Sequence, residues 1–315
     1  MLPSHERFEY SPITRRPEFT WPGGRRLAVH IPVNIEHFNY GEGGLGLSYS
    51  PGIPHPNTYN WGWREYGNRV GGFRLLELLT EHGVTPTALI NTSCYEHCPD
   101  LMDAYREAGA EFVGHGKTNS QAPNGLDENN ERELIREVYE AIEAAEGTPP
   151  GGWMSPGANP SRVTEDLLAE QGFRYSLDWP IDDQPTWLGT RGGSLLSVPY
   201  PHEVNDVPMI MFHHGSSQEF AQMAIDTLDE MVVQAEKQPL ACGITIHTFI
   251  IGQPFRLRQF RRVLEHMDKL RDRLWVTTAG AIADHYAEIS PPPSPGLGWK
   301  DRRQPSGEGD NERHG

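Results

Sequence analysis

The sequence predicts an α/β fold in which parallel strands alternate with helices and close into a barrel. Short β-branched apolar runs such as Gly243–Ile246 are typical of strands that are buried on both faces. Most of these runs are followed by a stretch with the apolar period of a helix. Repeated strand–helix units imply a parallel sheet, and about seven of them favour a barrel over an open sheet. No internal repeat or linker interrupts the pattern, so we expect one domain over residues 25–290.

The expected elements follow in chain order. Each strand is a short apolar run bounded by glycine, proline or polar residues, and we expect strands at Arg26–Ile35, Thr85–Thr92, Ala110–Gly114, Gly152–Ser155, Phe173–Asp178, Leu195–Pro199, Met209–Phe212, Gly243–His247 and Leu274–Thr277. The first helix has a leucine stripe and ends at Gly83, a common C-cap, and the third is acidic and amphipathic. The helices are expected at Val70–His82, Pro99–Ala108, Glu128–Glu146, Val163–Gln171, Gln218–Lys237, Leu257–Lys269 and Thr278–Ile289.

Three segments show neither the apolar pattern of a helix nor that of a strand. Residues 1–24 are rich in proline, arginine and aromatic residues, and we expect an extended arm. Residues 39–63 are dense in glycine, proline, tyrosine and tryptophan, and so long an irregular segment in a compact domain is usually functional. Residues 291–315 are proline-rich and then polar, which predicts a flexible tail.

Composition excludes several classes of function. The formal net charge of the 315 residues is −16, whereas nucleic-acid binding needs a clustered basic surface. No apolar run approaches the ~18 residues of a membrane span, and the N-terminus lacks the apolar core of a signal peptide. Three cysteines are a poor basis for a disulfide framework, and Cys94-x-x-His97-Cys98 lacks the second ligand pair of a zinc site. We therefore expect a protein of the reducing cytoplasm that binds neither nucleic acid nor membrane.

Polar residues follow several of the predicted strands. Asn34 and Glu36 share one face after the first strand, and His115 and Asn119 follow the third in a segment whose glycines let backbone approach a ligand. The segment 178–187 follows the fifth strand, and His247 ends a late one. Barrels of this class place their chemistry at the carboxyl ends of the strands. Together the four clusters predict a pocket floor of carboxylates, amides and two imidazoles.

These motifs resemble those of the polysaccharide deacetylase (carbohydrate esterase family 4) superfamily. The pieces that correspond are Asn34-Ile35-Glu36, His115-x-x-x-Asn119, Met154-Ser155-Pro156-Gly157 and Ile244-Thr245-Ile246-His247. Within the superfamily the chain looks most like the branch of metal-independent allantoinases and cyclic imide hydrolases. That likeness rests on Trp21-Pro22-Gly23, Glu65–Arg69, Asp182–Pro185, Pro199–Asp206 and the run from His247 to Arg256. The resemblance spans roughly residues 10–287 and implies a distorted (β/α)7 barrel.

The chain departs from the deacetylase pattern where that pattern holds its metal and its base. A deacetylase uses a carboxylate and two imidazoles as metal ligands and a second aspartate as base. Here the base position is Asn34 and the second imidazole is Asn119, which leaves Glu36 and His115 as strong ligands. Catalytic zinc usually has three protein ligands. Either the metal is lost, or His247 or His37 completes the set; we favour no bound cofactor, with zinc on Glu36, His115 and Asn119 as the alternative.

Hydrolysis of an amide or imide needs an activated water, a stabilised oxyanion and a proton for the leaving nitrogen. Glu36, beside Asn34, is the candidate base or water-orienting group, unless it forms a salt bridge with Arg69. His115 and His247 are the candidate acid and oxyanion donors, because imidazole titrates near neutrality. The expected substrate-binding residues have polar or aromatic side chains, and most belong to the resembled motifs. The acidic ones among them could instead cap turns. They are Arg69, Tyr66, Asn119, Trp179, Asp182, Asp183, Glu203 and Asn205.

We therefore predict a hydrolase of C–N bonds in a small cyclic amide, imide or ureide. The alternatives are a metal-dependent N-deacetylase of an acetylated sugar or peptidoglycan, and a barrel that binds a ligand without turnover. The partner is a small-molecule substrate whose identity depends on the 39–63 segment. Aromatic residues in that segment and in the arm also predict a homodimer or homotetramer, because large exposed apolar patches usually mark interfaces.

Overall fold

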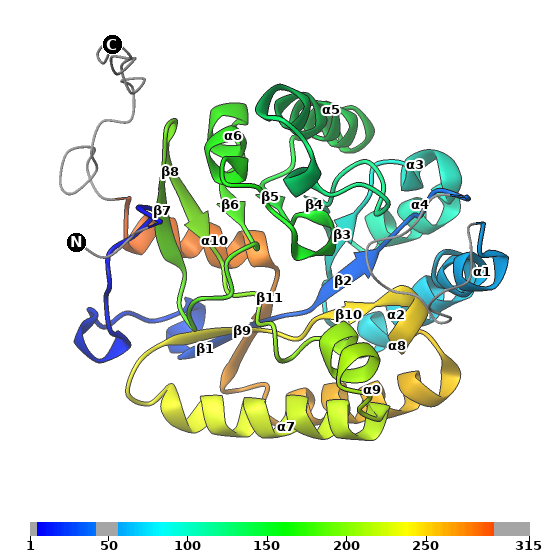
Figure 1. Ribbon diagram of the computed structural model, residues 1–315. Coiled ribbons are helices and arrows are strands. Elements are labelled where there is room, and N and C mark those ends of the chain that lie inside the picture. The colour runs from blue at the N-terminus through cyan, green and yellow to red at the C-terminus, as the bar shows by residue number, and fades with distance from the viewer. Residues whose placement is uncertain (1–4, 42–55, 293–315) are drawn as a thin grey trace, which may run out of the picture.

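The computed structural model describes residues 5–41 and 56–292, so most of the 39–63 segment and nearly all of the expected tail lie outside the described residues. Parallel strands form the centre of the molecule and helices cover them on the outside (Figure 1). The arrangement is a distorted α/β barrel, which confirms the predicted fold class.

The strands of the described residues form two hydrogen-bonded sheets. The larger sheet has the order β10-β2-β3-β4-β5-β6-β8-β7, and the smaller one has the order β11-β1-β9. Every pair is parallel except the β7–β8 hairpin. The bounds are β1 (Leu27–His30), β2 (Pro32–Ile35), β3 (Thr87–Ile90), β4 (Glu111–Gly114), β5 (Gly152–Trp153), β6 (Tyr175–Ser176), β7 (Thr186–Thr190), β8 (Gly193–Ser197), β9 (Leu240–Gly243), β10 (Ile246–His247) and β11 (Leu274–Thr277).

The distortion lies in the first predicted strand. Arg26–Ile35 was expected as one strand, but it divides at Ile31 into β1 and β2, which belong to different sheets. β1 pairs with β9 and β11, whereas β2 pairs with β10 and β3. The late strand is also divided and begins earlier than the expected Gly243–His247, because Leu240–Gly243 forms β9 and Ile246–His247 forms β10. The second halves of both strands therefore lie side by side, with His247 paired in register to Asn34.

Capping residues mark the ends of several helices. Asp127 caps α5 (Glu128–Glu146) by accepting two backbone N–H groups, and Gly147 ends it at φ 72°. Ser216 and Glu219 form a reciprocal capping box at α7 (Ser217–Gln234). The other helices are α1 (Thr58–Tyr66), α2 (Gly72–Glu81), α3 (Cys94–His97), α4 (Pro99–Glu107), α6 (Thr164–Gln171), α8 (Thr248–Ile251), α9 (Pro254–Lys269) and α10 (Ala279–Ile289).

A single π-helical turn, Gly67–Gly71, joins α1 to α2 and lies against α8. Glycine is needed here because a Cβ on Gly71 would meet the Thr248 carbonyl oxygen at 2.1 Å. A Cβ on Gly252 would in turn meet the Gly71 Cα at 2.4 Å. This close packing holds the end of α1 beside the residues that follow β10.

Several expected elements are corrected. Met209–Phe212 was expected as a strand but belongs to a helical turn, Val207–Phe212. The strand β7 was not expected; it begins at the end of the polar 178–187 segment and pairs antiparallel with β8, which follows it in the chain. The helix α1 begins inside the segment expected to be irregular. Glycine is needed at position 116 because its φ is 71° and a Cβ there would meet the Pro156 ring at 2.6 Å.

The described part of the arm lies on its own barrel. Arg7 is buried and makes two hydrogen bonds to the Asp166 carboxylate, at 2.7 and 2.9 Å. Arg16 binds Asp182 with both terminal nitrogens, at 2.7 and 2.5 Å. Ion pairs of Arg7 and Arg16 therefore connect the arm to the barrel. Among the helices of the described ranges, none is both long and apolar enough to cross a bilayer.

Candidate active site

Three of the predicted catalytic side chains meet at the carboxyl ends of their strands. Glu36 directly follows β2, His115 directly follows β4, and His247 ends β10. Glu36 Oε1 lies 3.5 Å from His115 Nε2 and 3.6 Å from His247 Nε2. All three side chains are more than nine-tenths buried. The carboxylate therefore lies between two imidazoles in a site that largely excludes water.

His247 is held by a carboxylate that was not among the expected site residues. Its Nδ1 donates to Asp206 Oδ1 at 2.6 Å, and its backbone N–H donates to Asp206 Oδ2 at 2.8 Å. Burial lowers the pKa of His247, but the charges of Asp206 and Glu36 outweigh burial and raise it above its ordinary value. His247 therefore stays protonated to a higher pH than a free histidine, and its Nε2 faces Glu36.

His115 has a different protonation pattern. Its Nδ1 lies 2.7 Å from the Met154 carbonyl oxygen, which only accepts hydrogen bonds, so Nδ1 carries the proton. In the neutral ring Nε2 then has a free lone pair. Within the described residues this buried nitrogen has no hydrogen-bond partner. His115 is thus poised to accept a proton at Nε2, whereas His247 is poised to donate one.

Glu36 is ionised by its surroundings. Burial raises the pKa of its carboxyl, but the surrounding positive charge, that of His247 first and with a smaller part from Arg64, outweighs burial and leaves the pKa below its ordinary value. Arg64, from α1, is buried with its guanidinium 3.8 Å from the centre of the Phe38 ring, and burial lowers its pKa to about 10. The predicted alternative of a Glu36–Arg69 salt bridge is wrong, because the Arg69 side chain is exposed and Glu36 faces the two histidines.

Asn34 and Asn119, which stand where the deacetylase pattern has its base and its second imidazole, are both buried. Asn34 Nδ2 donates to the Ile246 carbonyl at 3.3 Å and to the Tyr200 hydroxyl at 3.4 Å. Asn119 donates its backbone N–H to the His37 carbonyl at 2.8 Å, while its Oδ1 is buried without a partner among the described residues. Asn34 therefore ties β2 to β10, and Asn119 leaves a polar oxygen available to a bound molecule.

The donors around Glu36 do not fit a catalytic zinc ion well. Such sites usually have three strong protein ligands, and an amide oxygen replaces the third one here. Glu36 also carries the charge that His247 faces, so the carboxylate already has a cationic neighbour. In the described part of the chain, the catalytic residues do not form a group of three His, Cys, Asp or Glu ligand atoms within 4.8 Å of one another.

Three other predicted substrate-binding residues have hydrogen-bond partners within the protein. Tyr66 donates its hydroxyl to the Gly252 carbonyl and accepts from Arg74, at 3.3 and 2.6 Å. Trp179 donates its indole N–H to Glu165 at 2.6 Å. Asn205 accepts the Val207 N–H at 3.0 Å, a turn-capping contact. The structure therefore gives these side chains contacts within the protein.

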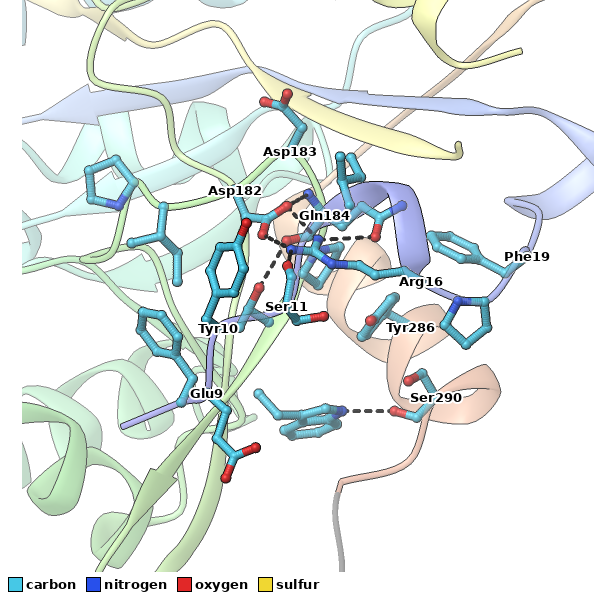
Figure 2. A pocket seen from close by; sticks show the side chains of 18 of the residues that line it. Glu9, Tyr10, Ser11, Arg16, Phe19, Asp182, Asp183, Gln184, Tyr286 and Ser290 are labelled. Carbon is cyan, nitrogen blue, oxygen red and sulfur yellow. Dashed lines mark hydrogen bonds and ion pairs between the residues drawn. The ribbon is translucent and has the colours of Figure 1, made fainter. Parts of the chain in front are cut away.

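Asp182, Asp183 and Glu203 line a separate cavity of about 860 Å³ between the arm, the 180–187 segment and α10. Figure 2 shows Arg16 reaching into this cavity toward Asp182 and Gln184. Burial and the neighbouring Asp182 raise the pKa of Asp183. Neither Glu36 nor either catalytic histidine lines this cavity, so the predicted site residues do not form one site.

The sequence of this chain is similar to those of polysaccharide deacetylases. Residues 58–176, which include His115 and Asn119, match the family model described as polysaccharide deacetylase. A putative polysaccharide deacetylase of Schizosaccharomyces pombe is 28% identical over 302 residues, covering 86% of this chain and 93% of that one. A peptidoglycan deacetylase of Helicobacter pylori is 24% identical over 258 residues, covering 72% of this chain and 87% of its own.

Two solved structures have the same fold over nearly the whole chain. PuuE allantoinase matches with a TM-score of 0.78 at 25% identity and covers 90% of this chain and 99% of its own. A probable polysaccharide deacetylase from Pseudomonas aeruginosa PAO1 matches with a TM-score of 0.77 at 25% identity, and the match covers 88% of this chain and 96% of that one. The similar structures therefore carry the names of two different hydrolytic activities.

Proposed function

We propose, for a chain that carries a polysaccharide deacetylase domain, hydrolysis of a C–N bond in a small cyclic amide, imide or ureide. The observation that carries this proposal is the position of Glu36 between a histidine that can accept a proton and one that can donate it. Such a site performs acid–base hydrolysis with its own side chains.

The first step is attack of water on the ring carbonyl. A water between Glu36 and His115 donates one O–H to the carboxylate, and His115 Nε2 takes the proton that is lost on attack. Glu36 remains ionised, orients the water and stabilises the imidazolium that forms on His115. The His247 imidazolium faces the negative charge that develops on the carbonyl oxygen.

The second step is cleavage of the C–N bond. The electron pair of that bond goes to nitrogen, and His247 Nε2 supplies the proton that nitrogen requires. Ring opening yields one product with a carboxylic acid and an amide or urea nitrogen, and the proton held on His115 returns to solvent or to His247. Asp206 stabilises His247 while it is charged and fixes its ring orientation.

Cyclic imides and ureides suit this donor set better than an acetamide. Their carbonyls are activated by a second acyl or urea group, so they need less electrophilic assistance from a metal. The replacement of an imidazole ligand by Asn119 and of an aspartate base by Asn34 agrees with such a substrate. The likeness to an allantoinase structure supports the same choice.

The test is turnover of a substrate panel of cyclic imides, hydantoins, allantoin, N-acetylated sugars and peptidoglycan fragments. Each compound is assayed with and without a chelator. We expect ring opening of at least one cyclic compound, with most of the rate retained under chelation. Activity confined to N-acetylated glycans would contradict the proposal.

The second candidate is a metal-dependent N-deacetylase, and one observation favours it. His115 Nε2 and Asn119 Oδ1 are both buried without partners in the described residues, and both are possible ligand atoms. The names of the S. pombe and H. pylori relatives point the same way. In the panel, this candidate predicts acetate release that is lost with chelator and restored by zinc.

A further inference from the structure

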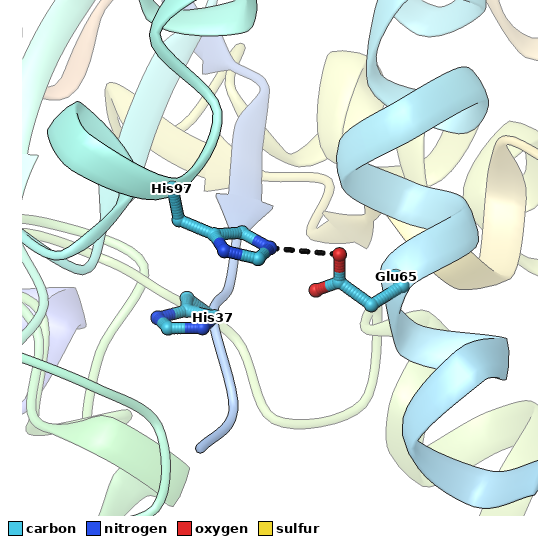
Figure 3. A group of neighbouring side chains, drawn as sticks. All are labelled: His37, Glu65 and His97. Carbon is cyan, nitrogen blue, oxygen red and sulfur yellow. Dashed lines mark hydrogen bonds and ion pairs between the residues drawn. The ribbon is translucent and has the colours of Figure 1, made fainter. Parts of the chain in front are cut away.

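A second cluster of potential ligands lies beside the catalytic residues. It consists of His37, Glu65 from α1 and His97 from α3, and we call it the two-histidine cluster (Figure 3). One ligand atom from each residue lies within 4.8 Å of the other two. Among the described residues this is where three such side chains converge. Three separate segments of the chain therefore bring their side chains to one point.

The side chains of the cluster need only small movements to bind an ion. His97 Nε2 lies 2.7 Å from Glu65 Oε2, and the rings of His37 and His97 stack with centroids 4.1 Å apart and planes at 17°. In Figure 3 both imidazoles lie on one side of the cluster and the Glu65 carboxylate faces them from α1. Tetrahedral zinc with bonds of ~2.0–2.1 Å places its ligand atoms about 3.4 Å apart. Ligation therefore requires His97 and Glu65 to separate slightly.

The stacked rings must also tilt, because an imidazole binds a metal in the plane of its ring. His97 can do so, since 29% of its side chain is exposed and it lies on a helix of one turn. The same exposure gives an ion access from solvent. Glu65 is 9% exposed, so His97 is the movable ligand and Glu65 is the fixed one.

The other two ligands are oriented by neighbouring groups. His37 Nδ1 is 2.8 Å from Ser93 Oγ, which leaves Nε2 without a hydrogen bond to any described residue. Asn68 Nδ2 donates to Glu65 Oε1 at 3.4 Å. Metal-binding histidines commonly hold their second ring nitrogen in such a hydrogen bond, and ligating carboxylates are likewise hydrogen-bonded.

The donor set indicates the class of metal. Two imidazoles and one carboxylate suit zinc, cobalt and nickel, whereas magnesium and calcium prefer oxygen ligands alone. Three protein ligands leave a fourth position open to water. We propose that the two-histidine cluster binds one divalent transition-metal ion of the zinc type.

The two-histidine cluster takes no part in the proposed reaction, but Asn68 and Asn119 connect it by hydrogen bonds to the catalytic residues. Asn68 Nδ2 also donates to the Glu36 backbone carbonyl at 2.9 Å, and Asn119 N–H donates to the His37 carbonyl at 2.8 Å. An ion here links the chain after β2 to α1 and α3 close to the catalytic carboxylate. Since an ion that binds the folded state stabilises it, metal binding raises the melting temperature without taking part in catalysis.

The test uses the full chain after treatment with chelator, titrated with Co²⁺ and followed by visible absorption, with Zn²⁺ as competitor and equilibrium dialysis for stoichiometry. We expect one equivalent of Co²⁺, displaced by Zn²⁺, and a higher melting temperature with either ion. His97→Ala removes the exposed ligand and is expected to weaken binding by at least ~100-fold. Glu65→Gln gives a second variant with the same expectation.

Two controls locate the ion. His266 forms a histidine–carboxylate pair with Asp229 at 2.7 Å outside any such three-residue group of the described chain, so His266→Ala is expected to leave binding unchanged. His115→Asn is expected to retain binding as well, since His115 belongs to the catalytic cluster. The proposal is overturned if the chain binds no Co²⁺, if His97→Ala and Glu65→Gln bind it normally, or if His115→Asn alone abolishes binding. None of these readouts uses turnover, so the proposed function stands or fails independently.

Discussion

Replacement of Asp206 by asparagine perturbs the proposed acid of the reaction while it preserves volume. The aspartate accepts two hydrogen bonds from His247, one from Nδ1 at 2.6 Å and one from the backbone N–H at 2.8 Å. Asparagine has one carbonyl oxygen, so it accepts only one of them. Asp206 is fully buried, so water cannot substitute for the lost oxygen.

The expected magnitude follows from these contacts. A hydrogen bond to a charged group contributes ~1.5–3 kcal/mol. Since each 1.36 kcal/mol in the barrier is a factor of ten in rate, loss of one such bond lowers kcat by roughly 10- to 100-fold. If the amide instead turns its NH₂ toward Nδ1, the ring adopts the other tautomer and the loss can approach ~10⁴-fold.

The pH profile gives a second readout. Asp206 and Glu36 raise the pKa of His247, so the acid form is lost as pH rises through that value and kcat declines. Without the Asp206 charge this decline begins at lower pH. Because the folded-state pKa is raised, the contribution of the pair to the free energy of unfolding is full below the unfolded pKa of ~6.5 and is lost as pH rises through the folded value. The variant is therefore destabilised most on the acid side.

A surface pair provides the matched control. His82 Nδ1 and Asp268 Oδ2 are also 2.6 Å apart, but Asp268 is 42% exposed and lies on the outer helix α9. Asp268→Asn is expected to leave kcat and its pH profile unchanged. A wild-type kcat with an unshifted alkaline decline in Asp206→Asn would refute the reasoning, and circular dichroism of each variant excludes misfolding as the cause.

Four further predictions follow from the same structure. Glu36→Gln and His247→Ala each lower kcat by at least ~10²-fold with the fold intact, and near-normal rates in both would show that the site is elsewhere. Chelator leaves most of kcat, whereas loss of activity together with a stoichiometric metal would favour the deacetylase alternative. Arg7→Ala leaves the buried Asp166 carboxylate with only its contacts to Arg191 and lowers the free energy of unfolding by about 1–3 kcal/mol in denaturant titrations, while the exposed Arg15→Ala changes it little. Light scattering is expected to show a homodimer or homotetramer that shifts toward monomer when residues 1–20 are deleted, and a monodisperse full-length monomer would contradict that assembly.

Helices and strands with a clear apolar period were predictable from the sequence, because that period follows from which side chains are buried. Glu128–Glu146 and Leu274–Thr277 have the bounds that the apolar pattern predicts. Met209–Phe212 was wrong because four apolar residues have no distinguishable period, and the neighbouring Pro208 is compatible with the first turn of a helix. The division of the first strand at Ile31 depends on which strands pair on either side, which no local pattern encodes.

The catalytic cluster was predictable in part. Glu36, His115 and His247 each end or follow a strand, and parallel strands bring such residues to one edge. The role of Asp206 was not predictable, because it reaches His247 through tertiary pairing of Asn205 with Thr245. Asp182 and Glu203 belong to motifs of the resembled branch, yet they line the cavity beneath the arm. The two-histidine cluster joins residues from three segments, and His97 was considered only with its neighbouring cysteines.

The central claim is that Glu36, His115 and His247 hydrolyse a cyclic C–N bond by acid–base chemistry. The most direct measurement is the rate of ring opening of a cyclic imide by the wild-type chain and by Glu36→Gln, each with and without chelator. We predict wild-type turnover that survives chelation and a loss of at least ~10²-fold in Glu36→Gln. Absence of ring opening, together with chelator-sensitive release of acetate from N-acetylated glycans, would contradict the claim.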